Sequence, residues 1–173
     1  HIEGDLLIHC GDFGPPQIID EWFQTIDFSH IVAVPGNHDH EAYERQVKGK
    51  AVFSNADLLV DRSLTIGALK LYGAPYFSEW KGAAYTLPHQ QVKQRLKAIP
   101  TDTNILITHI PPLGILDVAR NGEHWGCELL RERIEQLRPN IHCFGHVHAN
   151  YATTQQNHTK FINASNLSQG RIK

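Results

Sequence analysis

The chain has 173 residues, with 16 basic and 18 acidic side chains and a formal net charge of −2. This length suffices for one domain with a buried core, and the balanced charge offers no basic surface of the kind that binds nucleic acids. No apolar stretch approaches the roughly 20 residues of a membrane-spanning helix. We therefore expect a single domain with no nucleic-acid partner and no membrane segment.

The first half of the chain alternates strands with a helix. An apolar run predicts a buried strand over 6–8, and apolar residues at helical spacing predict a helix over 18–26. A second apolar run predicts a strand over 31–34, and alternating apolar residues between 58 and 72 predict two or three more strands.

The second half repeats this alternation. Its elements are a helix over 92–99, a strand over 105–107, a helix over 129–137, a strand over 141–144 and two strands near Tyr151 and Phe161. Pro100 and Pro139 follow the two helices, because proline cannot continue a helical hydrogen-bond pattern. This order of elements predicts an α/β domain over residues 1–173.

Polar side chains follow four predicted strands where each strand ends. The four groups are Gly11-Asp12, Gly36-Asn37-His38-Asp39, Thr108-His109 and Gly145-His146-Val147-His148. In open α/β sheets, the carboxyl ends of the strands face one crevice where ligands bind. If these strands share a sheet, six side chains converge there: Asp12, Asn37, His38, His109, His146 and His148.

These residue types are typical of metal ligands. Imidazoles with carboxylate and amide oxygens suit divalent ions such as Mn, Fe, Zn or Co. The carboxylate of Asp12 can bridge two ions, and two ions about 3.5–4 Å apart can hold a phosphoryl group and activate a water molecule. We therefore expect two divalent ions and a small phosphoester substrate.

The stretch from Asn37 to Asp39 combines a ligand with groups that can move protons. Asn37 would hold a metal, while His38 would protonate the leaving oxygen or stabilise charge in the transition state. Asp39 would orient the imidazole of His38. His146 and His148 would point to one face if their segment is extended.

Each motif also has a structural alternative. Gly11-Asp12 alone is typical of a turn, and Asn37 or Asp39 could cap a helix that begins after Asp39. His109 could be a core histidine at a strand end. Four strand ends that behave alike favour the ligand interpretation over these alternatives.

The sequence does not assign a single role to several other histidines and tryptophans. His9 and His142 lie within apolar runs and are expected in the core or behind the metal ligands. His124 lies in a loop that could overhang a pocket or belong to the surface. Trp80 and Trp125 could line a pocket or the rim of the core.

The motifs GD, GNHD, TH and GHVH, in this order from Gly11 to about Ala164, resemble the calcineurin-like metallophosphoesterase superfamily. The stretches GDLLIHCGDF, KLYGAPY, ILITHIPPLGILD, GCELLRERIEQLRPNIHCFGHVH and FINAS are similar to its small subfamily of metallophosphoesterase-domain-containing proteins. The resemblance implies a β-sandwich flanked by helices, with a dinuclear site at the carboxyl ends of strands.

The resemblance also implies an activity and the role of each residue. The activity is hydrolysis of phosphate esters by a metal-activated hydroxide, with diesters favoured and cyclic nucleotides as candidates. The implied roles are Asp12 as bridging ligand, Asn37, His109 and His146 as ligands of the second metal, His148 as ligand of the first, and His38 as the catalytic histidine.

One element of the family pattern is absent. The family begins with a strand that ends in Asp-x-His, and His1 stands too close to Asp12 to match that histidine. The chain also contains no methionine. We therefore expect a domain that lacks its N-terminal strand.

Two other functions fit the sequence less well. The missing Asp-x-His would suit a catalytically reduced binding or scaffold domain, but the intact Asn37-His38 pair argues against it. A nuclease is disfavoured by the absence of a basic groove. Three cysteines, an odd number that matches no zinc pattern, indicate thiols of a reducing compartment, hence a cytoplasmic location.

Overall fold

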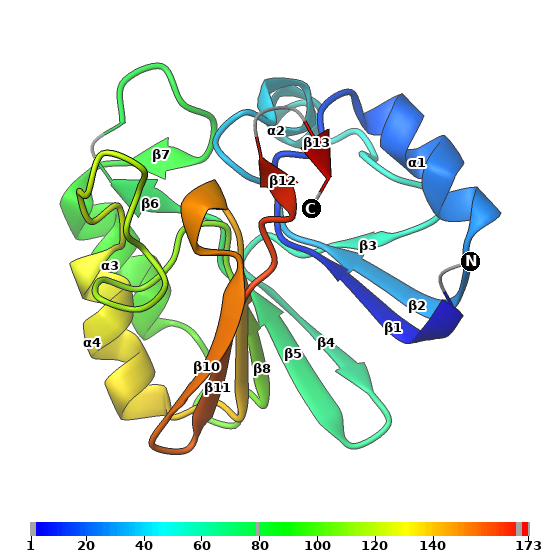
Figure 1. The fold of residues 1–173 in the computed structure, drawn as a ribbon. Helices are drawn as coiled ribbons and strands as arrows, with labels where there is room; N and C mark the ends of the chain where they lie inside the picture. Colours follow the sequence, from blue (N-terminus) through cyan, green and yellow to red (C-terminus); the bar gives the residue numbers. More distant parts are fainter. Residues whose placement is uncertain (1–2, 79, 169–170, 173) are drawn as a thin grey trace.

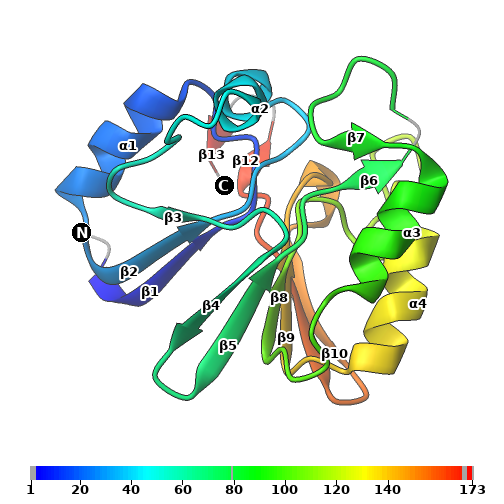
Figure 2. The same cartoon turned by 180° about the vertical axis from the view of Figure 1, so that it is seen from behind.

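The computed structural model describes residues 3–78, 80–168 and 171–172 (Figure 1). Two β-sheets pack face to face, and a pair of helices covers the outer face of each sheet (Figures 1 and 2). The predicted β-sandwich flanked by helices is thus confirmed.

The first sheet contains three parallel strands in the order β1-β2-β3. Its strands are β1 (Glu3–His9), β2 (Asp27–Ala33) and β3 (Asp57–Leu58). Helices α1 (Pro16–Thr25) and α2 (His40–Val47) lie on its outer side (Figure 1). Phe23 of α1 packs there with Ile31 and Ala33 of β2.

The second sheet contains six strands in the order β10-β11-β9-β8-β5-β4. Its strands are β4 (Arg62–Ile66), β5 (Leu69–Gly73), β8 (Ile105–Ile107), β9 (Ile141–Phe144), β10 (Ala152–Gln156) and β11 (Thr159–Asn163). Helices α3 (His89–Lys97) and α4 (Glu128–Leu137) cover its outer face (Figure 2). The pairs β5-β8, β8-β9 and β9-β11 are parallel, and both outer pairs are antiparallel.

The inner faces of the two sheets share one apolar cluster. Val32 of β2 and Val34, the residue just after β2, meet Leu71, Ile105 and Ile107 from the second sheet. All five side chains are buried, and each contributes about 1.5–3 kcal/mol through the hydrophobic effect. This cluster holds the two sheets together.

Several elements go beyond the sequence-based prediction. Strand β2 begins at Asp27, before its apolar run, because its polar first half pairs with β1. Helix α2, which begins after Asp39 as the capping alternative assumed, buries Ala42 and leaves most other side chains exposed, so no apolar stripe marks its extent. The short elements β6 (Phe77–Ser78), β7 (Thr86–Leu87), β12 (Leu167–Ser168), β13 (Arg171–Ile172) and η1 (His148–Asn150) were not predicted. In the described part of the chain, no helix has the length and apolar character needed to cross a membrane.

Candidate metal centre

The carboxyl ends of β1, β2, β8 and β9 meet at one edge of the sandwich. The first two strands belong to one sheet and the last two to the other, so the side chains come together although the four strands do not share one sheet. A hydrogen bond of 2.6 Å between His109 Nδ1 and the carbonyl of Cys10 joins the two sheets at this edge. The predicted site therefore forms between two sheets.

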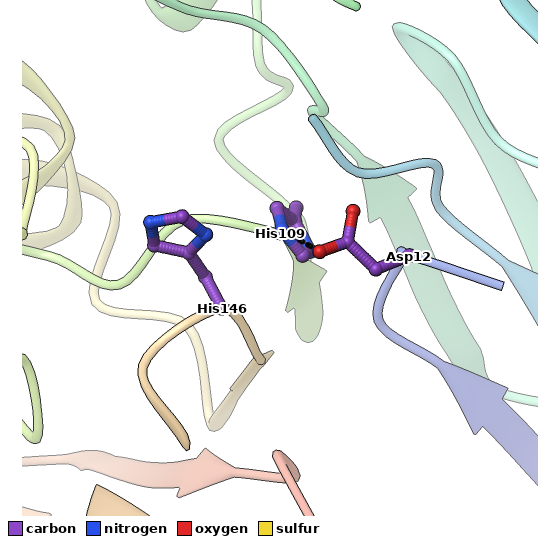
Figure 3. Close-up of side chains that lie close together, drawn as sticks. All are labelled: Asp12, His109 and His146. Atoms are coloured by element: carbon purple, nitrogen blue, oxygen red, sulfur yellow. Dashed lines mark ion pairs between the residues drawn. The ribbon is translucent and has the colours of Figure 1, made fainter. Parts of the chain in front are cut away.

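Four of the predicted ligands converge at this edge. Ligand atoms of Asp12, His109 and His146 all lie within 4.8 Å of one another (Figure 3). The Nε2 atom of His109 is 2.9 Å from Asn37 Oδ1 and 3.3 Å from Asp12 Oδ2. His146 Nδ1 is 3.1 Å from the same Asn37 oxygen. A carboxylate, an amide oxygen and two imidazoles thus surround one point.

The hydrogen bonds of His109 indicate that a cation fits at this point. The carbonyl of Cys10 can only accept, so the Nδ1–H of His109 donates to it. In the neutral ring, Nε2 then presents a lone pair to the oxygens of Asp12 and Asn37. Such lone pairs repel one another unless a proton on Nε2 or a bound cation lies between them. A hydrogen bond on the far nitrogen is also typical of metal-binding histidines.

Asp12 is held in its ionised form. Burial favours its protonated form, but hydrogen bonding to His109 and the backbone N–H of His38 outweigh burial and lower its pKa to about 2. The N–H of His38 donates to Asp12 Oδ1 over 3.0 Å. Asp12 therefore offers negative charge to a cation over the whole physiological pH range.

Burial keeps His146 neutral, as a ligand must be. Desolvation, followed by repulsion from His109, lowers its pKa to about 3. Its Nε2 is buried and has no hydrogen-bond partner among the described residues. The rings of Trp80 and Trp125 lie 4.8 and 5.8 Å from the His146 ring, between centroids.

Asp39 organises the backbone of the site. Both carboxylate oxygens accept backbone N–H groups over 2.7–3.3 Å, and the donors are Asp12, Phe13, Gly14 and Gly36. Asp39 makes no side-chain hydrogen bond that caps α2, and the structure does not place it against the His38 ring as expected. A buried carboxylate needs several donors, and in this loop backbone amides supply them. Burial raises its pKa to about 6, although the Gly36 N–H opposes that shift.

A cavity of about 990 Å³ opens beside the ligand cluster. His38 and His148 line it together with Asp12, Asn37 and His146, and His38 is exposed. His146 has a left-handed backbone with φ of 65°, and His148 begins η1, so these two residues are not in an extended segment. Both nevertheless reach the same cavity, whose size suits a small molecule.

The two histidines within apolar runs lie behind the ligands. His142 is fully buried and its Nε2 is 2.9 Å from the Thr108 hydroxyl, which donates to the carbonyl of Ile110. His142 thereby braces the strand end that carries His109. The ring of His9 packs edge-on against Phe13 and Phe23. His142 is thus a core residue, as expected, whereas His9 is only partly buried beside these rings.

Glycine at position 36 is required by close packing around Asp12. A Cβ atom at this position would lie 2.7 Å from both the backbone nitrogen of Asp12 and Cε1 of His109. Gly36→Ala should therefore displace two ligands and lower the affinity for Mn²⁺ by about 10- to 100-fold, as disturbed metal sites commonly show. Titration of the purified protein with Mn²⁺ measures this loss.

Gly145→Ala is the matched control, because its added Cβ would meet its nearest atom, the carbonyl oxygen of Cys10, at 3.2 Å. This variant should bind Mn²⁺ with a smaller loss. Equal affinities of Gly36→Ala and the unmodified protein would contradict the packing argument.

The sequence interpretation missed two cations of the cavity wall, Lys81 and Arg120. They lie in loops without periodicity, and no nearby motif marks them.

Comparisons with known proteins show the family to which this chain belongs. A family model described as calcineurin-like phosphoesterase matches residues 1–150. A UPF0046 protein of Caenorhabditis elegans is 34% identical over 188 residues, which cover 97% of this chain and 64% of that protein. Metallophosphoesterase domain-containing protein 1 of Homo sapiens is 30% identical over 194 residues, covering 94% of this chain and 60% of that protein. The chain thus spans less than two thirds of the length of these two relatives.

The structure of a phosphopantetheinyl hydrolase from Mycobacterium tuberculosis superposes with a TM-score of 0.64. The alignment covers 93% of this chain and 78% of that one at 16% sequence identity, so it shows a shared fold.

Proposed function

Because this chain belongs to the calcineurin-like phosphoesterase family, we propose that it is a metal-dependent hydrolase of phosphate esters. The observation that carries this proposal is the convergence of Asp12, His109 and His146 beside a cavity of small-molecule size. A divalent ion held there would supply a Lewis acid for phosphoryl oxygens and would acidify a water molecule.

We propose two divalent ions, with manganese as a candidate. Asn37, His109 and His146 would hold one ion, His148 the other, and Asp12 would serve both. The mixture of imidazole, carboxylate and amide ligands supports a borderline metal such as Mn, Fe, Zn or Co.

His38 is our candidate for the general acid. Its side chain is exposed on the cavity, and its backbone N–H is tied to Asp12, which fixes its position beside the ligands. It would deliver a proton to the departing alcohol oxygen. Asp39 would act as a positioning residue, because it holds the loops that carry Asp12 and Asn37.

The substrate class is a finer proposal. The resemblance to the metallophosphoesterase-domain-containing subfamily favours phosphodiesters, and cyclic nucleotides remain candidates. Assays with bis(4-nitrophenyl) phosphate and 4-nitrophenyl phosphate compare a diester with a monoester that share one leaving group.

With Mn²⁺, the protein should hydrolyse the diester faster than the monoester, and EDTA should abolish both reactions until Mn²⁺ is restored. The Asp12→Ala variant, purified identically, controls for contaminating phosphatases, because it should lose its metal. Hydrolysis that survives EDTA, or an inactive protein that has bound its metal, would refute the proposed activity.

The compartment is also a proposal. Cys10, Cys127 and Cys143 are all free thiols, which is typical of a reducing compartment such as the cytoplasm.

A further inference from the structure

Two tryptophans stand at the cavity next to the ligand cluster. The indoles of Trp80 and Trp125 lie 6.2 Å apart, between ring centroids, with an interplanar angle of 85°. Both residues line the cavity, and 37% and 40% of their surfaces are exposed. Both rings also contact His146. The two indoles thus form an aromatic wall beside a candidate metal ligand.

The exposed surface of these indoles is available to a ligand. An indole gains stability when a flat apolar ring covers it, through burial and through stacking or edge-to-face contact. Two such rings at one cavity, almost perpendicular to each other, offer both contact geometries to the same guest.

The loop of Trp125 is held in place before any ligand binds. Its backbone N–H donates to the carbonyl of Asp117 over 3.0 Å, and the next residue, Gly126, donates to Asp117 Oδ2 over 3.2 Å. The other carboxylate oxygen is 2.9 Å from His124 Nδ1. Asp117 is 1% exposed, so this buried carboxylate fixes the chain on both sides of Trp125. A fixed aromatic ring costs less entropy on binding than a mobile one.

This network also answers the question about His124. Its ring pairs with Asp117, and His124 is not among the described residues that line the cavity. Its contribution is therefore to the loop that presents Trp125.

We infer that Trp80 and Trp125 form a subsite for a planar aromatic group attached to the phosphorus of the ligand. The identity of the phosphorus end rests on the proposed function: a phosphoryl group near His146 would place its organic substituent against the indoles. Lys81 and Arg120, on the same cavity, add positive charge that suits an anionic ligand.

Phenylphosphonate and methylphosphonate test this subsite by isothermal titration of the Mn²⁺-loaded protein. They share the anionic end, differ by the planar ring and have a P–C bond that the proposed hydrolase does not cleave. The unmodified protein should bind phenylphosphonate at least about fivefold more tightly, the lower end of the range for one stacked ring. Trp80→Leu and Trp125→Leu should each lower this ratio towards one and leave methylphosphonate binding and metal content unchanged.

Two further variants separate recognition from folding. Trp125→Phe keeps a ring and should retain most of the preference. Trp22→Leu is the matched control, because Trp22 on α1 is 38% exposed and is not among the cavity-lining residues, and it should keep the full ratio.

An unchanged ratio in both cavity variants would overturn the inference. So would an equal loss of both phosphonates, or a loss of metal, which would mean that the indoles merely shield His146. Ring preference that depends on the indoles, in a protein that hydrolyses no ester, would support the subsite and refute the proposed activity. Ester hydrolysis by a protein that shows no preference for the ring would support the proposed activity and refute the subsite.

Discussion

Replacing Asp12 by alanine should lower the affinity for divalent metal by more than about 100-fold. Loss of an outer partner of a ligand already costs about 10- to 100-fold, and Asp12 is the carboxylate of the three-residue cluster. Its removal would leave two imidazoles and an amide with no negative charge among them. Metal content after dialysis against Mn²⁺, together with titration by Mn²⁺, measures the loss.

Two variants control this experiment. Asp20→Ala removes another carboxylate that accepts backbone N–H groups, those of Ser54 and Asn55, and it should retain full metal content. Asp12→Asn keeps an oxygen that can accept the His38 N–H but removes the charge, so its affinity should fall between the other two. Full metal content in Asp12→Ala would show that Asp12 is not a ligand.

The fold was largely predictable because apolar periodicity marks most of its long elements. Buried strands such as β8 and β9 are short apolar runs, and α1 and α4 carry apolar stripes. Helix α2 shows no apolar periodicity, because Ala42 is its only buried residue. Apolar periodicity also did not predict how the strands divide into two sheets, since it shows which face is buried and not which strands are neighbours.

The convergence of the candidate ligands was predictable for a different reason. Asp12, Asn37, His109 and His146 stand where strands end, and strand ends gather at one edge of the fold. The role of Asp39 was not predictable, because its partners are backbone amides from two loops far apart in sequence. The left-handed backbone conformation of His146 was also not predictable from the sequence. Non-glycine residues rarely adopt positive φ values, and tertiary packing is what imposes this one.

Alanine variants of the neighbours Asn37 and His38 should have different effects on metal binding and on turnover. His38→Ala should keep its metal, because no atom of the His38 side chain belongs to the ligand cluster in the described structure. It should slow turnover by about 10²- to 10⁴-fold, the usual contribution of general acid–base catalysis. Asn37→Ala, in contrast, should weaken metal binding, since its Oδ1 lies about 3 Å from nitrogens of both His109 and His146.

The leaving group distinguishes proton donation from charge stabilisation by His38. A 4-nitrophenolate ion departs without a proton, whereas an alkoxide needs one. The loss of kcat in His38→Ala should therefore be larger for an alkyl phosphate ester than for its 4-nitrophenyl analogue. His30→Ala, which removes an exposed histidine on β2, should leave both rates unchanged. Equal losses on the two esters would exclude a general acid and leave charge stabilisation, and loss of metal in His38→Ala would make this histidine a ligand.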